Sequence, residues 1–334
     1  MSYVQALVPA EHASNHLLVL PGTPGPQSLV ELADAWFADV RWLREPRVVE
    51  AVRRATGARF RGIAVSEPPR TEPGVLGIGA EHGAAGPFEV APEASPQAGL
   101  TGPSTAFALG RVDGTFDART GRPTSLDDRD GIARAFAAGL PEGEELRLVQ
   151  WGVAVARKLG GVVLADGRHL LRPDPAGAVD LTVYAGRQLS AEDLLALLRA
   201  QVATAQADTS PSASGPGRVR MLGRTPYDGT VVVEAEQVDR VPRVLSGLEP
   251  RSYGPHVVRI TWVPQDPYEL RTEVPSGVHA IARARMRAVV ARLALHVCAT
   301  AGGTVVDDGA FVATTAQIEQ RTSEQTPGTV RAWV

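Results

Sequence analysis

The sequence contains very little cysteine and very little lysine. Cys298 is the only cysteine in 334 residues, which excludes an intrachain disulfide and a metal site built from several cysteines. Lys158 is the only lysine, so a mechanism that needs a Schiff-base lysine has a single candidate residue. No glycine–lysine pair occurs anywhere in the chain, which excludes a phosphate-binding P-loop.

The chain also lacks an excess of charge and a long apolar run. Its formal net charge is −3, and no basic stripe of the kind that binds nucleic acid is present. The most apolar helical segment, residues 286–301, is interrupted by Arg292 and His296 and is shorter than the ~20 residues of a membrane span. Residues 1–22 do not have the pattern of a signal peptide. We therefore expect a cytoplasmic protein with neither a nucleic-acid nor a membrane partner.

Several common catalytic and cofactor motifs are missing as well. The seven histidines show no HxH or HExxH spacing, so no metal site is predicted, and no GxSxG motif marks a hydrolase. The glycines of residues 77–83 resemble a dinucleotide loop only superficially, because one extra residue precedes the last glycine and no clear helix follows. The sequence predicts no cofactor.

What the sequence does have is the composition and length of a two-domain globular protein. Hydrophobic residues make up 44% and charged residues 21% of the chain. Two stretches interrupt the ordered pattern. Residues 67–104 contain seven prolines and seven glycines and are expected to form a loop or lid, with a short strand at residues 87–90. Residues 206–217 resemble a flexible loop.

Around these stretches, similar segments occur twice. Residues 16–22 (HLLVLPG) and 180–186 (DLTVYAG) are each followed by a turn and a helix, and they lie 164 positions apart. Residues 160–167 (GGVVLADG) and 302–309 (GGTVVDDG) share five of eight residues, and each follows an apolar helix. Glycine directly after a helix is the usual left-handed cap. The pattern indicates two related halves.

Each half has room for two further strands between these segments. They are expected at residues 60–65 and 105–112 in the first half and at 231–238 and 256–263 in the second. The order β-α-β-β-α-β predicts an α+β protein of two tandem ferredoxin-like repeats with antiparallel sheets, residues 1–172 and 173–334. The alternative is a single doubly wound α/β sheet.

One short motif resembles a known enzyme family. Residues 110–115 (GRVDGT) fit the GxxDG pattern of dye-decolorising peroxidases, which are also built from two ferredoxin-like halves and bind haem. The resemblance implies that Asp113 is the distal acid. It covers five residues, and the surroundings of His256, His279 and His296 do not match the proximal histidine of that family. A second Asp-Gly-Thr at residues 228–230 favours a turn between strands at both places.

A second candidate region is the strand at residues 256–263. Alternation places His256 and Trp262 on one face and Arg259 on the other. A face with histidine and tryptophan could line a cavity, and Arg111 lies on the corresponding strand of the first half. The candidate binding residues are therefore Arg111, Asp113, His256, Arg259 and Trp262.

No acid, base and nucleophile converge in any motif. We therefore expect a non-catalytic ligand-binding, regulatory or assembly module, whose partner is a protein or small molecule of unknown identity and which could form homo-oligomers. The alternative is an enzyme whose site is assembled from scattered residues between the two halves, with a haem peroxidase as its most specific form.

Overall fold

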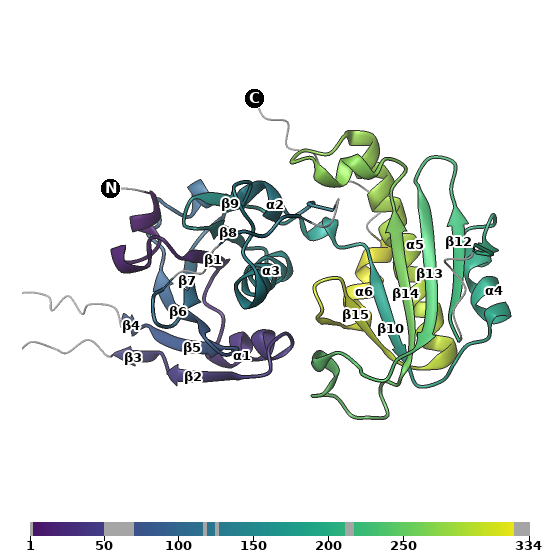
Figure 1. Ribbon diagram of the computed structural model, residues 1–334, viewed down its shortest axis with the longest axis horizontal. Helices are drawn as coiled ribbons and strands as arrows, with labels where there is room; N and C mark the ends of the chain where they lie inside the picture. Colours follow the sequence, from purple (N-terminus) through teal and green to yellow (C-terminus); the bar gives the residue numbers. More distant parts are fainter. Residues whose placement is uncertain (1–2, 50–69, 116–118, 124–126, 211–216, 324–334) are drawn as a thin grey trace, which may run out of the picture. The chain divides into compact units, whose positions relative to one another are not determined.

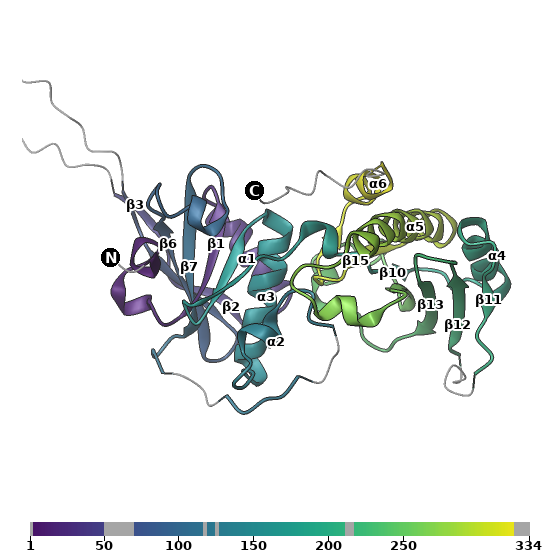
Figure 2. The same ribbon diagram turned by 90° about the horizontal axis from the view of Figure 1, so that it is seen from above.

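The computed structural model describes residues 3–49, 70–115, 119–123, 127–210 and 217–323. The chain separates into two compact units (Figures 1 and 2). The first unit comprises Met1–Gly121 and Ala138–Arg172, and the second comprises Arg122–Ala137 and Pro173–Val334. The sixteen-residue segment 122–137 therefore interrupts the first unit in sequence and belongs to the second in space.

The first unit is built on a seven-stranded sheet in which every pair of neighbouring strands is antiparallel. The strand order is β2-β5-β6-β7-β1-β8-β9. Its strands are β1 (His16–Pro21), β2 (Val40–Arg44), β5 (Gly74–Ile78), β6 (His82–Glu89), β7 (Ser104–Arg111), β8 (Val162–Ala165) and β9 (His169–Leu171). A separate two-stranded sheet pairs β3 (Arg47–Val49) with β4 (Arg70–Glu72).

Both faces of the central strands in the first unit are covered. Helix α3 (Gly143–Leu159) packs on β1, β7 and β8, and helix α1 (Pro26–Asp34) lies beside β2. On the other face, Leu17 and Val19 of β1 pack against apolar residues from the N-terminal segment and from residues 90–100. Strand β1 is consequently buried on both sides, which fits its continuous apolar run.

The second unit is built on another seven-stranded antiparallel sheet, with the order β11-β12-β13-β14-β10-β15-β16. Its strands are β10 (Leu181–Ala185), β11 (Gln206–Ala207), β12 (Val219–Arg224), β13 (Thr230–Gln237), β14 (His256–Val263), β15 (Thr304–Asp307) and β16 (Val312–Ala313). Its helices are α2 (Ile132–Ala135), α4 (Ala191–Gln201), α5 (Gly277–Ala301) and α6 (Thr315–Ser323).

Helix α5 runs along one face of the second sheet, with α6 beside it (Figure 2). Its apolar residues and those of β10, β13 and β14 form the core of this unit. Charged side chains of β12, β13 and β14 pair with one another, as Arg220 does with Glu234 and Arg259 with Glu236. Opposite charges on neighbouring strands stabilise a sheet surface that faces water.

Local signals account for several helix ends. Gly160, which ends α3, has a φ of +71° in the left-handed region that favours glycine. Ser190 caps α4 by accepting a hydrogen bond from the Asp193 N–H at 3.0 Å. Ser276 caps α5 in the same way through the His279 N–H, at 3.2 Å.

The mixed α+β prediction with antiparallel sheets is confirmed, whereas the alternative of one doubly wound sheet is wrong. The two sheets are separate, and no described neighbouring strands are parallel. The strand expected at residues 60–65 lies outside the described residues. The strands expected at 105–112, 231–238 and 256–263 are present as β7, β13 and β14, each with bounds shifted by at most one residue.

The prediction of a loop or lid at residues 67–104 is wrong for about half of its described part, because β4, β5 and β6 lie there, and the short strand expected at 87–90 is the end of β6. Some of the glycines that favoured a loop are needed for close strand contacts. A Cβ on Gly74 would lie 2.5 Å from the Arg44 carbonyl oxygen, and a Cβ on Gly83 would lie 2.6 Å from that of Leu76. In the stretch 206–217, Gln206 and Ala207 pair with β12 rather than forming a loop, and residues 211–216 lie outside the described part.

Candidate functional site

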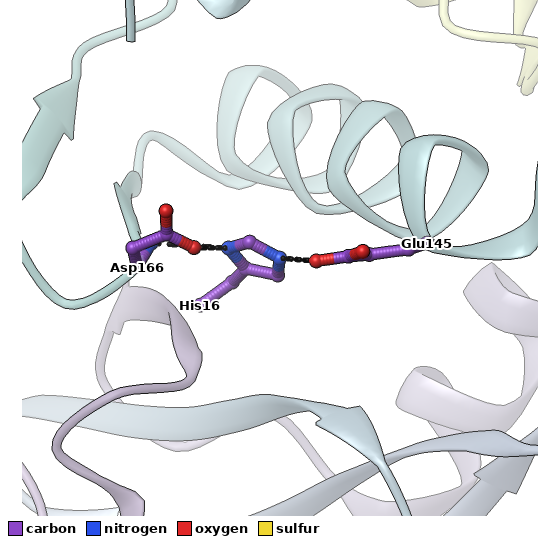
Figure 3. Close-up of side chains that lie close together, drawn as sticks. All are labelled: His16, Glu145 and Asp166. Atoms are coloured by element: carbon purple, nitrogen blue, oxygen red, sulfur yellow. Dashed lines mark hydrogen bonds and ion pairs between the residues drawn. The ribbon is translucent and has the colours of Figure 1, made fainter. Parts of the chain in front are cut away.

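A cluster of buried and half-buried charged groups lies at one end of the first sheet. His16 is the first residue of β1, Glu145 lies in the first turn of α3, and Asp166 follows the last residue of β8. Because β8 pairs with β1 and α3 packs on both strands, these three side chains meet although they are far apart in sequence (Figure 3). We call His16, Glu145, Asp166 and the neighbouring Arg119 the His16 cluster.

The imidazole of His16 lies between the two acids. Its Nε2 is 3.0 Å from Glu145 Oε1, and its Nδ1 is 3.1 Å from the backbone N–H of Asp166. A backbone N–H can only donate, so Nδ1 accepts, and Nε2 carries the proton that is donated to Glu145. The carboxylate Oδ1 of Asp166 is 3.3 Å from the same Nδ1 and would pair with a protonated ring.

Arg119 connects the two acids on another side. Its guanidinium donates to Glu145 Oε1 at 2.7 Å and also to Asp166 Oδ2. Burial acts to raise the pKa of Glu145, but the hydrogen bonds and charges of His16 and Arg119 outweigh burial and hold that pKa below its ordinary value. With a neutral imidazole, two carboxylates and one guanidinium leave the cluster with one negative charge.

The cluster extends from the interior to the surface and leaves little free space. The side chains of His16 and Glu145 are 3% and 6% exposed, whereas those of Arg119 and Asp166 are each 23% exposed. The adjoining cavity, lined in part by His16, His82, Arg111 and Glu145, measures about 10 Å³. That volume is close to the space needed by one water molecule. An organic substrate therefore does not fit between these side chains in this arrangement.

A second histidine–glutamate pair lies beside the cluster. Glu144 accepts hydrogen bonds from the N–H groups of Ala80 and Glu81, at 2.8 and 3.1 Å, and lies 2.8 Å from Nδ1 of His82. Burial acts to raise the pKa of Glu144, and these hydrogen bonds lower it to a net value below the ordinary one. The Glu144 carboxylate thus holds the turn between β5 and β6 against the start of α3.

The His16 cluster contains ligand types that bind metal ions. One ligand atom from each of His16, Glu145 and Asp166 can be chosen so that all three lie within 4.8 Å of one another. Imidazole with carboxylates is a ligand set that suits first-row divalent ions. In the present arrangement, however, the guanidinium of Arg119 bridges the two carboxylates and supplies the positive charge.

Arg111 and Asp113 lie at the end of β7, in the first unit. Arg111 pairs with Glu81 at 2.7 Å and contacts Asp113 at 3.4 Å. Asp113 accepts hydrogen bonds from the N–H and hydroxyl groups of Thr115, and these bonds, with that of Arg111, lower its pKa to about 2. The side chain of Asp113 is 55% exposed. These contacts are those of a residue that stabilises a surface turn.

His256, Arg259 and Trp262 lie on β14, in the second unit, whereas Arg111 and Asp113 lie in the first unit. Arg259 pairs with Glu236 on the neighbouring strand. Trp262 is 3% exposed, donates from Nε1 to the Asp228 carbonyl oxygen at 2.7 Å, and packs its ring 5.1 Å from that of His279. Its contacts are those of a core residue with a satisfied indole N–H.

None of the four members of the His16 cluster is predicted as a site residue from the sequence. The apolar segment that begins at His16 and the turn that contains Asp166 indicate only a strand and a turn. One signal was available: Glu145 lies three and four positions before the buried Leu148 and Val149, so a charged group occupies the apolar face of α3. A carboxylate on such a face requires partners in the interior.

No family model matches the chain, and no match was found among curated proteins or solved structures. Within the described part of the chain, no helix has the length and apolar character required to cross a membrane.

Proposed function

We propose that this chain is a non-catalytic cytoplasmic module that binds a ligand or assembles with a partner, and that it arose by duplication of a ferredoxin-like unit. The observation that carries the non-catalytic part is the closed state of the His16 cluster. Its charged groups are paired with one another, and the adjoining cavity of about 10 Å³ has no room for an organic substrate. A buried ionic network of this type fixes the packing of a helix on a sheet.

The strand orders support the duplication. Numbered within each unit, β1, β6, β7 and β8 are arranged as 2-3-1-4, and β10, β13, β14 and β15 have the same arrangement. Read from the other edge this is 4-1-3-2, the order of a ferredoxin-like sheet with two split βαβ units. Helix α3 in the first unit and helix α5 in the second each connect the third of these strands to the fourth. Two further strands at one edge and one at the other complete each sheet.

The pairing registers refine the correspondence between the two units. Aligning the two Gly-Gly segments equates Leu164 with Val306, whose partners across the ladder are Leu17 and Thr182. The first strands therefore correspond with an offset of 165 residues rather than the 164 suggested by sequence similarity, and His16 corresponds to Leu181. The same alignment places Arg287 at the position of Glu145. The His16 cluster is thus specific to the first unit.

Residue-resolved histidine acylation followed by mass spectrometry tests the closed state of the cluster. His16 is 2% exposed, whereas His169 at the start of β9 is exposed and serves as the control in the same molecule. We expect His169 to react at least about tenfold faster in the folded protein. Equal rates would show that the cluster opens to substrate-sized molecules, which would overturn the non-catalytic proposal in favour of an enzyme.

Native mass spectrometry of the freshly purified full chain tests the binding or assembly part of the proposal. We expect either a retained ligand or an oligomer that dissociates on dilution. A strictly monomeric, ligand-free chain at all concentrations would contradict this part, and the acylation result would still decide whether the cluster is closed.

A further inference from the structure

We infer that the His16 cluster is an exchangeable divalent-cation site, in which a first-row ion such as Zn²⁺ replaces the guanidinium of Arg119. In the exchanged state, His16 supplies one nitrogen ligand, and Glu145 and Asp166 supply carboxylate oxygens. Arg119 withdraws to solvent. The site goes beyond the proposed binding or assembly function and does not depend on it.

The spacing of the ligand atoms supports this assignment. Zinc binds histidine nitrogen and carboxylate oxygen at about 2.0–2.2 Å, which places neighbouring ligand atoms about 3–4 Å apart. The three ligand atoms already lie within 4.8 Å of one another, and His16 Nε2 lies 3.0 Å from Glu145 Oε1. Asp166, whose Oδ1 lies on the Nδ1 side of the ring, would turn toward Nε2 to complete the coordination.

Buried acceptor atoms provide an independent observation. Oε2 of Glu145, on a side chain that is 94% buried, and Oδ1 of Asp166 accept no hydrogen bond within the described structure. Buried carboxylate oxygens are costly when they lack a partner. Coordination through His16 Nε2 would move the ring proton to Nδ1, which would give up the hydrogen bond that it accepts from the Asp166 N–H. The cation would provide a partner for Glu145 Oε2.

Arg119 is the member of the cluster that can leave. Its side chain is 23% exposed, compared with 3% for His16. An arginine stem can extend into water while its charge remains solvated. Two buried carboxylates deprived of the guanidinium need another positive charge, and a divalent ion supplies it at the same place.

Zinc titration by isothermal calorimetry, with the full-length chain and with the Arg119→Ala variant, tests the exchange. Removing the competing guanidinium, a unit charge about 4 Å away, is expected to tighten zinc binding at least about fivefold. Arg168→Ala is the matched control, because it removes an exposed arginine two positions from Asp166 and should leave the affinity within about twofold of wild type. Mg²⁺, which prefers oxygen ligands only, should bind weakly to all three proteins.

The double variant Arg119→Ala/Asp166→Asn distinguishes this site from surface histidines. Asp166 has a φ of +54°, which asparagine tolerates, so the substitution removes a ligand charge without changing the turn. We expect it to weaken zinc binding at least about tenfold relative to Arg119→Ala. If Arg119→Ala does not fold, as judged by circular dichroism, Arg119→Gln takes its place, since glutamine is neutral but polar.

Limited trypsin digestion of the wild-type chain gives a readout that does not use a variant. Zinc should accelerate cleavage after Arg119, because the released arginine becomes accessible. Three results would overturn the proposal: equal zinc affinity of Arg119→Ala and Arg168→Ala, undiminished zinc binding by the double variant, or zinc-independent cleavage after Arg119.

Discussion

Replacing Glu145 by glutamine should destabilise the first unit substantially, although the change is nearly isosteric. Glu145 is 5% exposed and accepts charge-assisted hydrogen bonds from His16 and Arg119, at 3.0 and 2.7 Å. Hydrogen bonds to charged groups contribute about 1.5–3 kcal/mol each, and the glutamine amide can retain part of them. We therefore expect a loss of about 2–3 kcal/mol in the free energy of unfolding at pH 7.

The loss can be measured as a shift in the thermal unfolding of the first unit. A unit of about 150 residues loses roughly 2–4 °C in Tm per kcal/mol, so the expected decrease is about 4–12 °C. Trp151, which is fully buried on α3, contributes to the change in tryptophan fluorescence when this unit unfolds. Glu142→Gln is the matched control, because Glu142 precedes the same helix but is exposed, and its replacement should change Tm by less than about 2 °C.

The effect of Glu145→Gln should also depend on pH in a defined direction. The folded-state pKa of Glu145 is lowered, so its carboxylate contributes stability above its unfolded-state pKa of about 4.3. That contribution is lost as the pH falls through the folded-state pKa, and the difference between wild type and variant should shrink below about pH 4. An unchanged Tm at pH 7, or equal effects of Glu145→Gln and Glu142→Gln, would refute the assignment of the cluster as a stabilising network.

Three further predictions concern other parts of the fold. Burial raises the pKa of Asp180 to about 6, so the folded state binds a proton more tightly than the unfolded state does. The stability of the second unit should therefore rise by the order of 2 kcal/mol as the pH falls from 8 to 4.5. Asp180→Asn should abolish that rise, as measured by urea unfolding. Gly79 has a φ of +72° and lies against the Glu144 carboxylate. Gly79→Ala should therefore lower the free energy of unfolding by about 1–3 kcal/mol and accelerate hydrogen exchange at Ala80 and Glu81. Gly102→Ala, also at positive φ but in open space, should lower it less. Burial raises the pKa of the Cys298 thiol to about 11, so iodoacetamide at pH 8 should label it only after unfolding, and rapid labelling of the folded chain would contradict its placement on α5.

The sequence was most informative where a structure depends on neighbouring residues. The helix that ends at Gly160 and the capping serine Ser190 are recognisable because glycine and serine satisfy local backbone requirements. Strand β5 and the first part of β6 were not predicted, because glycines such as Gly74 and Gly83 are required there by close contacts across the sheet and not by a local turn. Composition alone does not distinguish these two uses of glycine.

The candidate site was not predictable from motifs for a related reason. His16 and Asp166 are 150 residues apart in the chain and meet only because β1 and β8 are neighbours in the sheet. A correct prediction would have required the strand order before the site. Asp113, by contrast, belongs to a compact motif, yet its contacts are with Thr115 two positions away. Local motifs therefore identified turns, and distant pairings produced the cluster.

Because segment 122–137 belongs to the second unit, truncation of the chain is expected to affect the two units differently. A break after Arg172 would leave the first unit with all of its strands, because segment 122–137 would merely be an unused insertion. The second unit would lose that segment and with it the hydrogen bonds from Arg129 to Gly177, from Asp128 to Leu270 and from Arg134 to Arg271. During synthesis, these docking residues emerge before any strand of the sheet that receives them. The first half of the chain thus contains a segment that packs only with the second unit. Separating the halves after Arg172 should leave the first unit able to fold, whereas the second unit would lack this segment.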